Sequence, residues 1–173
     1  MRLANLALIL AVAGALAACN RPGELAGGPE GFGGPVGAGA GTYLPGSASD
    51  PTSPAYFTTQ VGDRVLFVVD TSTLTDEARG ILSNQARWLQ QNTGYTAVIE
   101  GHADEQGTRE YNLALGARRA AAAQEFLVAQ GVPPARLRTV SYGKERPLAV
   151  CSEESCYAQN RRAVTVLALG AGV

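Results

Sequence analysis

The sequence predicts an α+β domain in which two helices pack on one mixed β-sheet, with a disordered linker before the domain. In the C-terminal part of the chain, β-branched apolar runs alternate with segments whose apolar residues recur at helical spacing. Their order is strand, helix, strand, helix, strand, strand. Of the 21 Gly and 9 Pro in the 173 residues, 10 Gly and 6 Pro lie in residues 20–55. Such a segment cannot bury enough apolar surface to offset its ordering entropy, which predicts the linker.

The length and the charge of the chain narrow the classes of function. A chain of 173 residues is long enough for one ordinary domain with a proper core. The net charge of −1 lacks the basic footprint of a nucleic-acid binder, and it offers no polybasic patch for anionic lipid headgroups. We therefore expect no nucleic-acid partner.

The N-terminus has the pattern of a lipoprotein signal peptide, predicted over residues 1–18. Arg2 is followed by about 16 almost wholly apolar residues, too short for a typical membrane span. A buried helix is the alternative, but a Gly/Pro-rich block follows at once. Leu16-Ala17-Ala18-Cys19 resembles the bacterial lipobox, which implies a diacylglycerol thioether on Cys19 and an acyl chain on its new amino group. More than one chain gives stable anchoring, and Asn20 in place of Asp favours the outer membrane.

Residues 19–55 are predicted to join this anchor to a domain over 56–173. As a flexible coil, such a tether spans roughly 30–36 Å r.m.s.. The domain is predicted to begin with a buried strand over 64–69, which ends at Asp70. Thr75 then caps a helix with acids in its first turn. The helical face that follows consists of Ala78, Ile81, Leu82, Gln85, Ala86 and Leu89, and the helix ends at Asn92-Thr93-Gly94.

The second half of the domain follows the same pattern. A strand over 96–100 leads through a Gly-bounded loop, 101–107, to a long helix over about 109–130, which Gly131 stops. The last two strands are predicted over 137–142 and 162–169.

Several polar residues are placed where these elements can bring them together. Asp70 and Asp104 follow strand ends, and Asn112 and Arg119 share one helical face with Leu115 between them. Arg161 or Arg162 stands at the start of the last strand. An Asp and an Arg in one pocket suit a zwitterion, because the carboxylate takes an ammonium group and the guanidinium takes a carboxylate. Spacing alone favours the alternative of structural salt bridges or solvated charges.

Four segments resemble one known family. Residues 100–112, Glu-Gly-His-Ala-Asp-Glu-Gln-Gly-Thr-Arg-Glu-Tyr-Asn, are similar to the signature of the OmpA-like domain family of peptidoglycan-associated lipoproteins. The helix that continues over 113–120 and the segments 141–147 and 160–164 match its later blocks. The resemblance covers about residues 61–169 and implies an OmpA-like β-α-β-α-β-β sandwich.

The resemblance implies binding of peptidoglycan stem peptides through meso-diaminopimelate. By position, Asp104 would receive the side-chain ammonium of that residue and Arg119 its carboxylate. Asn112 and Leu115 would line the same wall of the pocket as Arg119. Asp70 and Thr71 would approach the ligand from the loop after the first strand. One of Arg161 and Arg162 would contact the peptide, since strand alternation points the other away.

The resemblance also implies a role for the whole chain. It would tether the outer membrane to the cell wall as a periplasmic, lipid-anchored part of the Tol-Pal system, with TolB and other Tol proteins as partners, and would support envelope integrity and outer-membrane constriction in cell division. No enzymatic activity and no cofactor are implied. The alternative is a periplasmic cell-wall hydrolase that uses Asp104 and Asp70 as an acid/base pair.

Two departures from the family pattern affect the expected site. The first strand ends Phe67-Val68-Val69-Asp70, so of the family's acid-aromatic alternation only the last acid is kept. Ala103 and Gln106 replace the usual threonine and arginine beside Asp104, so secondary contacts to a ligand are weaker.

The remaining candidates are a histidine and two cysteines. His102 is the only His, and we expect it to be structural; no metal site is predicted. Cys151 and Cys156 remain after lipidation of Cys19. In an oxidising periplasm they form either a disulfide or two free thiols, and the sequence does not decide between these states.

Overall fold

The computed structural model describes residues 43–169 of the chain. The predicted signal peptide, Cys19 and most of the predicted tether lie outside these residues. The elements are α1 (Pro54–Tyr56), η1 (Phe57–Gly62), β1 (Arg64–Leu66), α2 (Asp76–Gln91), β2 (Tyr95–His102), α3 (Arg109–Ala129), η2 (Pro134–Arg136), β3 (Leu137–Gly143), α4 (Glu154–Asn160) and β4 (Arg162–Leu169).

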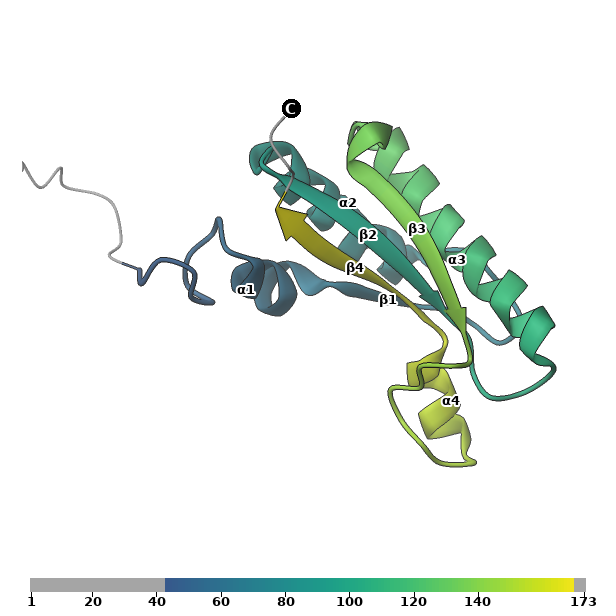
Figure 1. The fold of residues 1–173 in the computed structure, drawn as a ribbon. Coiled ribbons are helices and arrows are strands. Elements are labelled where there is room, and N and C mark those ends of the chain that lie inside the picture. Colours follow the sequence, from purple (N-terminus) through teal and green to yellow (C-terminus); the bar gives the residue numbers. More distant parts are fainter. Residues whose placement is uncertain (1–42, 170–173) are drawn as a thin grey trace, which may run out of the picture. The chain divides into compact units, whose positions relative to one another are not determined.

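The four strands form one mixed sheet in the order β1-β4-β2-β3. β2 and β3 are parallel, and β4 is antiparallel to both of its neighbours, β1 and β2. The long helices α2 and α3 cover one face of the sheet, while α4 lies at its lower end in Figure 1. The predicted α+β fold with helices on one mixed sheet is therefore confirmed.

The core lies between this helical layer and the sheet. On β2 the inward side chains Ala97 and Ile99 are buried, as period-2 alternation requires. On α2 the buried positions recur at helical spacing and include Leu82 and Leu89. From α3, Leu127 completes the same cluster.

A close backbone approach fixes α3 on the sheet. A Cβ atom built on Gly101 would lie 1.8 Å from the carbonyl oxygen of Gly116, so neither strand nor helix tolerates a larger residue at this crossing. Arg119 follows Gly116 by three residues, almost one helical turn. The crossing therefore sets the position of Arg119 under the end of β2.

The folded part extends to the N-terminal side of the predicted boundary at residue 56. Ser53 is 2% exposed and caps α1 by accepting a hydrogen bond from the Tyr56 amide. The indole nitrogen of Trp88 donates to the Pro51 carbonyl at 2.7 Å. Residues 51–55 thus pack on the domain, because their backbone groups find partners there.

The first strand is shorter than the pattern predicted. The Phe67 amide still bonds to the Arg161 carbonyl at 2.8 Å, but Val68 and Val69 leave the sheet and are exposed. Asp70 has φ +58°, a left-handed conformation that a strand cannot contain. β-branched residues predict a strand from propensity, and here tertiary contacts of the Val68 carbonyl override it.

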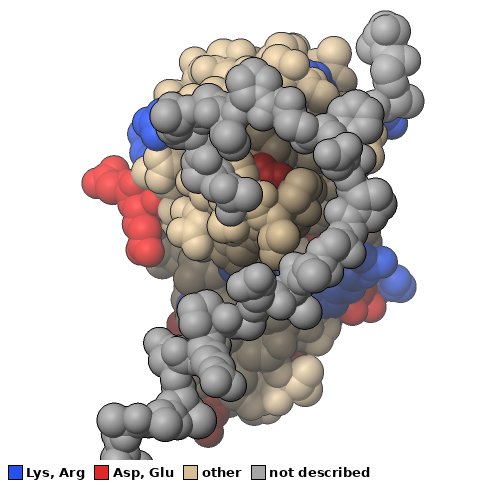
Figure 2. Space-filling model, turned by 90° about the vertical axis from the view of Figure 1, so that its left-hand side faces the viewer, with Lys and Arg blue, Asp and Glu red and all other residues tan. Residues whose placement is uncertain are grey.

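Charge is sparse on one side of the molecule. In the view of Figure 2, most of the visible surface of the described residues is neither acidic nor basic, and the charged groups lie mainly towards its margins. The described residues visible on this face form no continuous basic surface of the kind with which proteins bind nucleic acids.

Candidate binding site

The predicted site residues meet where the loops after β1 and β2, the first half of α3 and the start of β4 come together. Arg119 of α3 donates from Nη1 to the carbonyl of His102, the last residue of β2, at 2.9 Å. Arg161, just before β4, donates from Nη1 to Oδ2 of Asp104 at 3.2 Å. Tyr111 of α3 donates from its hydroxyl to Oδ1 of Asp70. Segments up to 94 residues apart in the chain therefore meet at one end of the sheet.

Asp104 is a partly satisfied carboxylate at the surface of this cluster. Its side chain is 13% exposed. Oδ2 accepts from Arg161, and Oδ1 accepts from the Gln106 amide at 3.3 Å. An ionised carboxylate offers about four lone-pair positions, so acceptor capacity remains on both oxygens. Asp104 is therefore able to accept a hydrogen bond from an external cation.

Arg119 is a fully buried cation that backbone carbonyls hold. It is 0% exposed and donates from Nε to Thr71 O at 2.8 Å, from Nη1 to His102 O at 2.9 Å and from Nη2 to Val68 O at 3.2 Å. Its guanidinium also lies 5.2 Å from the centre of the Phe67 ring. Within residues 43–169 no carboxylate lies at ion-pair distance from it.

The surroundings of Arg119 determine the pKa of its guanidinium. Burial lowers its pKa to about 10, while the more distant charges of Asp104 and Asp70 oppose that shift and Arg161 adds to it. The residue is still cationic at neutral pH. Residues 43–169 accept from three of its five N–H donors, which leaves two for an anion as far as this part of the chain is concerned.

The structure separates the two arginines that the sequence left as alternatives. Arg161 points into the site, where it contacts Asp104, Glu154 and the Phe67 carbonyl. Arg162 points the other way and donates to the Arg146 and Asn160 carbonyls. Alternation of side chains along an extended segment produces this division. Of the two, only Arg161 belongs to the cluster around Asp104.

Asn112 and Leu115 have different positions on the wall that α3 provides. Asn112 is buried and donates from Nδ2 to the Gln106 carbonyl at 2.6 Å, which holds the loop that carries Asp104. Leu115 is buried one turn before Arg119. Both side chains shape the wall, and Asn112 is the one with a direct polar contact to the loop.

Asp70 and Thr71 line the approach to Arg119. Asp70 adopts its left-handed backbone while the Tyr111 hydroxyl holds its carboxylate, and this hydrogen bond raises the pKa of the tyrosine. The Thr71 carbonyl accepts from Arg119, and the Thr71 amide closes a turn with Val68 O at 3.3 Å. The segment from Val68 to Thr71 therefore covers the guanidinium.

Asn160 fixes the chain immediately before Arg161. Its Oδ1 accepts from the amides of Leu148 and Ala149 at 2.7 and 3.0 Å, and its Nδ2 donates to Oε1 of Glu105 at 2.6 Å. One buried amide thus joins α4, the loop before it and the loop of Asp104. This network sets the direction in which Arg161 leaves the backbone.

Sequence reasoning missed two polar residues at this site. Tyr111 directly precedes Asn112 in the motif of residues 100–112, and this position in the motif was the signal that could have identified it. Glu154 contacts Arg161 through both carboxylate oxygens, and no spacing pattern marks it in the sequence.

A disulfide joins Cys151 and Cys156, whose Cα atoms are 5.8 Å apart. Glu154 lies within the ring that this disulfide closes.

His102 sits in the strand end as a neutral side chain. Burial lowers its pKa to about 4, with smaller contributions from Arg162 and Arg146. Its Nε2 is 3.6 Å from the Glu100 carboxylate, beyond hydrogen-bond distance, and the ring lies against Tyr142.

Residues 43–169 contain no group of three metal-ligating side chains. In the same range no helix is long and apolar enough to cross a membrane.

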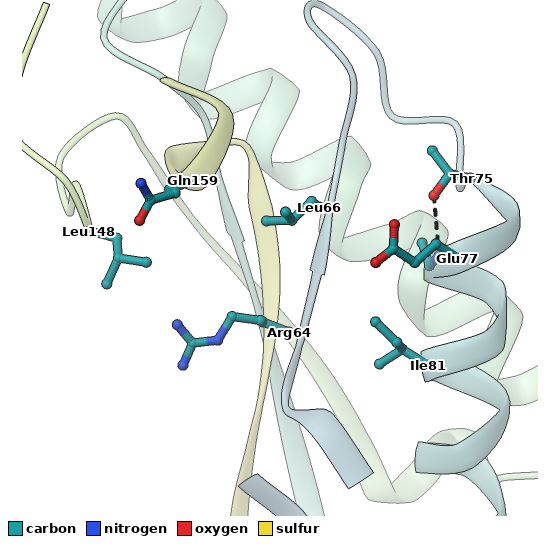
Figure 3. Close-up of a pocket in the computed structure, with 8 residues that line it drawn as sticks. Arg64, Leu66, Thr75, Glu77, Ile81, Leu148 and Gln159 are labelled. Atoms are coloured by element: carbon teal, nitrogen blue, oxygen red, sulfur yellow. Dashed lines mark hydrogen bonds between the residues drawn. The ribbon is translucent and has the colours of Figure 1, made fainter. Parts of the chain in front are cut away.

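A cavity of about 300 Å³ lies apart from these residues, beside the edge strand β1. Figure 3 shows Arg64 and Leu66 of β1 between α2 on one side and Leu148 and Gln159 on the other. Its lining consists of Arg64, Leu66, Thr75, Glu77, Ala78, Ile81, Leu148 and Gln159. None of the predicted binding residues lines it.

The fold and the cluster define a class of protein, an OmpA-like module that presents a carboxylate beside buried arginines. The model of the OmpA family matches residues 66–161. The peptidoglycan-associated lipoprotein of Mesorhizobium japonicum is 59% identical over 134 residues, which cover 78% of this chain and 76% of the relative. That of Pseudomonas aeruginosa is 46% identical and covers 90% of this chain and 91% of the relative. The chain belongs to the OmpA family and, within it, to the peptidoglycan-associated lipoproteins.

Solved structures support the same assignment. The crystal structure of the peptidoglycan-associated lipoprotein from Burkholderia pseudomallei has a TM-score of 0.62 and 38% identity, and the match covers 70% of this chain and 98% of that one. The C-terminal domain of Helicobacter pylori MotB, at 21% identity and a TM-score of 0.59, shares the fold. The family is one of binding proteins, and the chain is not an enzyme.

Proposed function

We propose that the chain binds peptidoglycan through the diaminopimelate residue of its stem peptides and so tethers the outer membrane to the cell wall. The observation that carries this proposal is the pairing of Asp104, which keeps free acceptor positions, with Arg119, whose buried charge has no carboxylate at ion-pair distance within the described residues. A ligand group with both an ammonium and a carboxylate complements the two.

The proposed complex requires a local movement. Because Arg119 is fully buried, a ligand carboxylate reaches its two unused N–H groups only when the covering segment from Val68 to Thr71 shifts. Val68 is 58% exposed and its side chain is not part of the core, so the movement costs little apolar burial. Asp70, carried on that segment, then approaches the ligand from the same side.

The membrane anchor and the protein partners are further parts of this proposal, and the names of the relatives support only its general outline. Their names describe lipoproteins associated with peptidoglycan. In this chain Cys19 would carry the lipid, residues 19–55 would contain the tether, and the domain after it would bind the wall at the periplasmic face of the outer membrane. The Tol proteins, TolB among them, and a role in outer-membrane constriction in cell division belong to this proposal.

Co-sedimentation with purified sacculi tests the binding function. The full-length chain should pellet with diaminopimelate-type sacculi and much less with lysine-type sacculi, whose side chain lacks the second carboxylate. Asp104→Asn, which keeps the shape and removes the charge, should lose most of this binding. Asp76→Asn, at an exposed acid in the first turn of α2, is the matched control. Equal pelleting of all three proteins would contradict the site, and release of soluble muropeptides would contradict the non-enzymatic function.

The anchor is tested separately by fractionation. Cys19→Ser should leave the chain out of the outer-membrane fraction while its binding to sacculi persists. Recovery of this variant in the outer membrane would contradict lipidation at Cys19.

A further inference from the structure

The small ring closed by Cys151 and Cys156 delivers one acidic side chain to the site. The two cysteines are five residues apart, and the ring runs into α4, whose first residue is Glu154. Glu154 is the residue of this ring that contacts Arg161. A short closed ring limits the positions that its side chains can reach, because the crosslink removes most of the freedom of the open chain.

Glu154 and Asp104 share a single guanidinium. Nη1 of Arg161 lies 3.2 Å from Oδ2 of Asp104 and 3.4 Å from Oε2 of Glu154, while Nη2 donates to Oε1 of Glu154. The hydrogen bond from Arg161 lowers the pKa of Glu154, which is therefore ionised at neutral pH. Asp104 thus receives one of the contacts of Arg161, and Glu154 receives two.

We propose that Glu154 is a positioning residue of the binding site, which holds Nη2 of Arg161 away from Asp104 and so leaves acceptor positions on Asp104 for the ammonium group of the ligand. The proposal rests on the proposed function. It assigns a role to the disulfide as well, because the ring holds Glu154 in place against Arg161. Asp104, Glu154 and Arg161 together also carry a net negative charge, which favours a cationic group beside them.

In the absence of Glu154, Arg161 could pair with Asp104 through both of its terminal nitrogens. A guanidinium with a single carboxylate partner tends to pair with it through two parallel hydrogen bonds. Without the charge of Glu154, Nη2 of Arg161 is free to turn to Asp104. An internal ion pair with Arg161 would then occupy the acceptor positions of Asp104, and the ammonium group of a ligand would have to compete with Arg161 for them.

The variant Glu154→Gln tests the proposal against Glu153→Gln. Glu153 lies in the same ring, is exposed, and forms no ion pair within residues 43–169. In the full-length chain, Glu154→Gln should weaken binding to diaminopimelate-type sacculi about threefold to tenfold, and Glu153→Gln should change it less than twofold. Equal affinities of the two variants would overturn the proposal.

A double-mutant cycle tests the role of the ring. Replacement of Cys151 and Cys156 by serine should weaken binding in the same direction as Glu154→Gln. Combined with Glu154→Gln, the serine replacements should add little further loss, because both act through one contact. Full additivity would show that the ring does not act through Glu154.

A measurement without ligand separates this proposal from the proposed function. In a crystal structure of Glu154→Gln, both terminal nitrogens of Arg161 should lie within hydrogen-bond distance of Asp104. An unchanged Arg161 would overturn the positioning role even if the wild-type chain binds sacculi. Conversely, if the wild-type chain fails to bind sacculi, the proposed function fails, and the crystal structure still decides whether Glu154 positions Arg161.

Discussion

Replacement of Arg119 by lysine should destabilise the fold although it keeps the positive charge. The guanidinium bonds three carbonyls at once, and they belong to Val68, Thr71 and His102. An ammonium group on a straight stem cannot reach three oxygens that lie around a planar fork. The variant therefore loses at least two of these hydrogen bonds, and the carbonyls that they leave must find water or stay unpaired.

The size of the effect follows from the burial of each carbonyl. The bond to His102 is fully buried, whereas those to Val68 and Thr71 are partly buried and their carbonyls can regain water. A buried group without a partner costs about 1–3 kcal/mol, and an accessible hydrogen bond contributes about 0.5–1.5 kcal/mol. We expect a loss of about 2–4 kcal/mol, which corresponds to a fall in melting temperature of roughly 6–12 °C for a domain of this size.

Urea unfolding of the full-length chain, followed by circular dichroism, measures this loss directly. Arg118→Lys is the matched control, because Arg118 is the exposed neighbour on the same helix. A difference of less than about 0.5 kcal/mol between the two variants would refute the argument that the three carbonyls depend on the guanidinium.

Three further outcomes follow from single contacts. Gly101→Ala should lower the free energy of unfolding by about 3 kcal/mol or more, because its Cβ would meet the Gly116 carbonyl at 1.8 Å, whereas Gly94→Ala, with open space around it, should be nearly neutral in thermal melts. The pKa of His102 is about 4 in the folded chain and about 6.5 in the unfolded chain. Below pH 6.5 the unfolded chain therefore binds a proton at His102 that the folded chain does not bind. The free energy of unfolding should fall by up to about 3 kcal/mol as the pH drops from 7 to 4. Urea titrations of His102→Phe should lack the part of this slope between pH 6.5 and 5, where free carboxyl groups do not yet titrate, and an unchanged slope would assign it to other groups. Asp70→Asn should keep the fold, since asparagine tolerates the left-handed conformation, and should weaken co-sedimentation with sacculi; unaltered binding would remove Asp70 from the site.

The sheet and the two long helices were predictable because their signals are local. The cap at Thr75 and the apolar stripe of α2 predicted its start, and the structure begins the helix at Asp76. Gly131 predicted the end of α3 to within a residue or two. The last strand has the predicted bounds, Arg162–Leu169. In each case the deciding residues are neighbours in the chain, so periodicity and capping contain the information.

Features that depend on distant partners were not predictable. The run 64–69 has the composition of a strand, yet pairing stops at Leu66, because the Val68 carbonyl accepts from a helix residue 51 positions away. The helix α4 is short, has no side-chain cap and contains a cysteine of the disulfide, so neither length nor capping marks it. Alternation predicted that Arg161 and Arg162 point apart, but only the contact with Asp104 shows which one faces the site.

The two site arginines differ in how their charge is compensated, and this difference would orient a zwitterionic ligand. Two carboxylates offset the charge of Arg161, so it has little attraction left for an anion. Among the described residues, the hydrogen bonds of Arg119 all go to carbonyls, and these neutralise no charge. We therefore expect the carboxylate of the proposed ligand at Arg119 and its ammonium at Asp104. Since the ligand carboxylate would compete with the carbonyls of Val68 and Thr71, binding and the position of this covering segment are coupled.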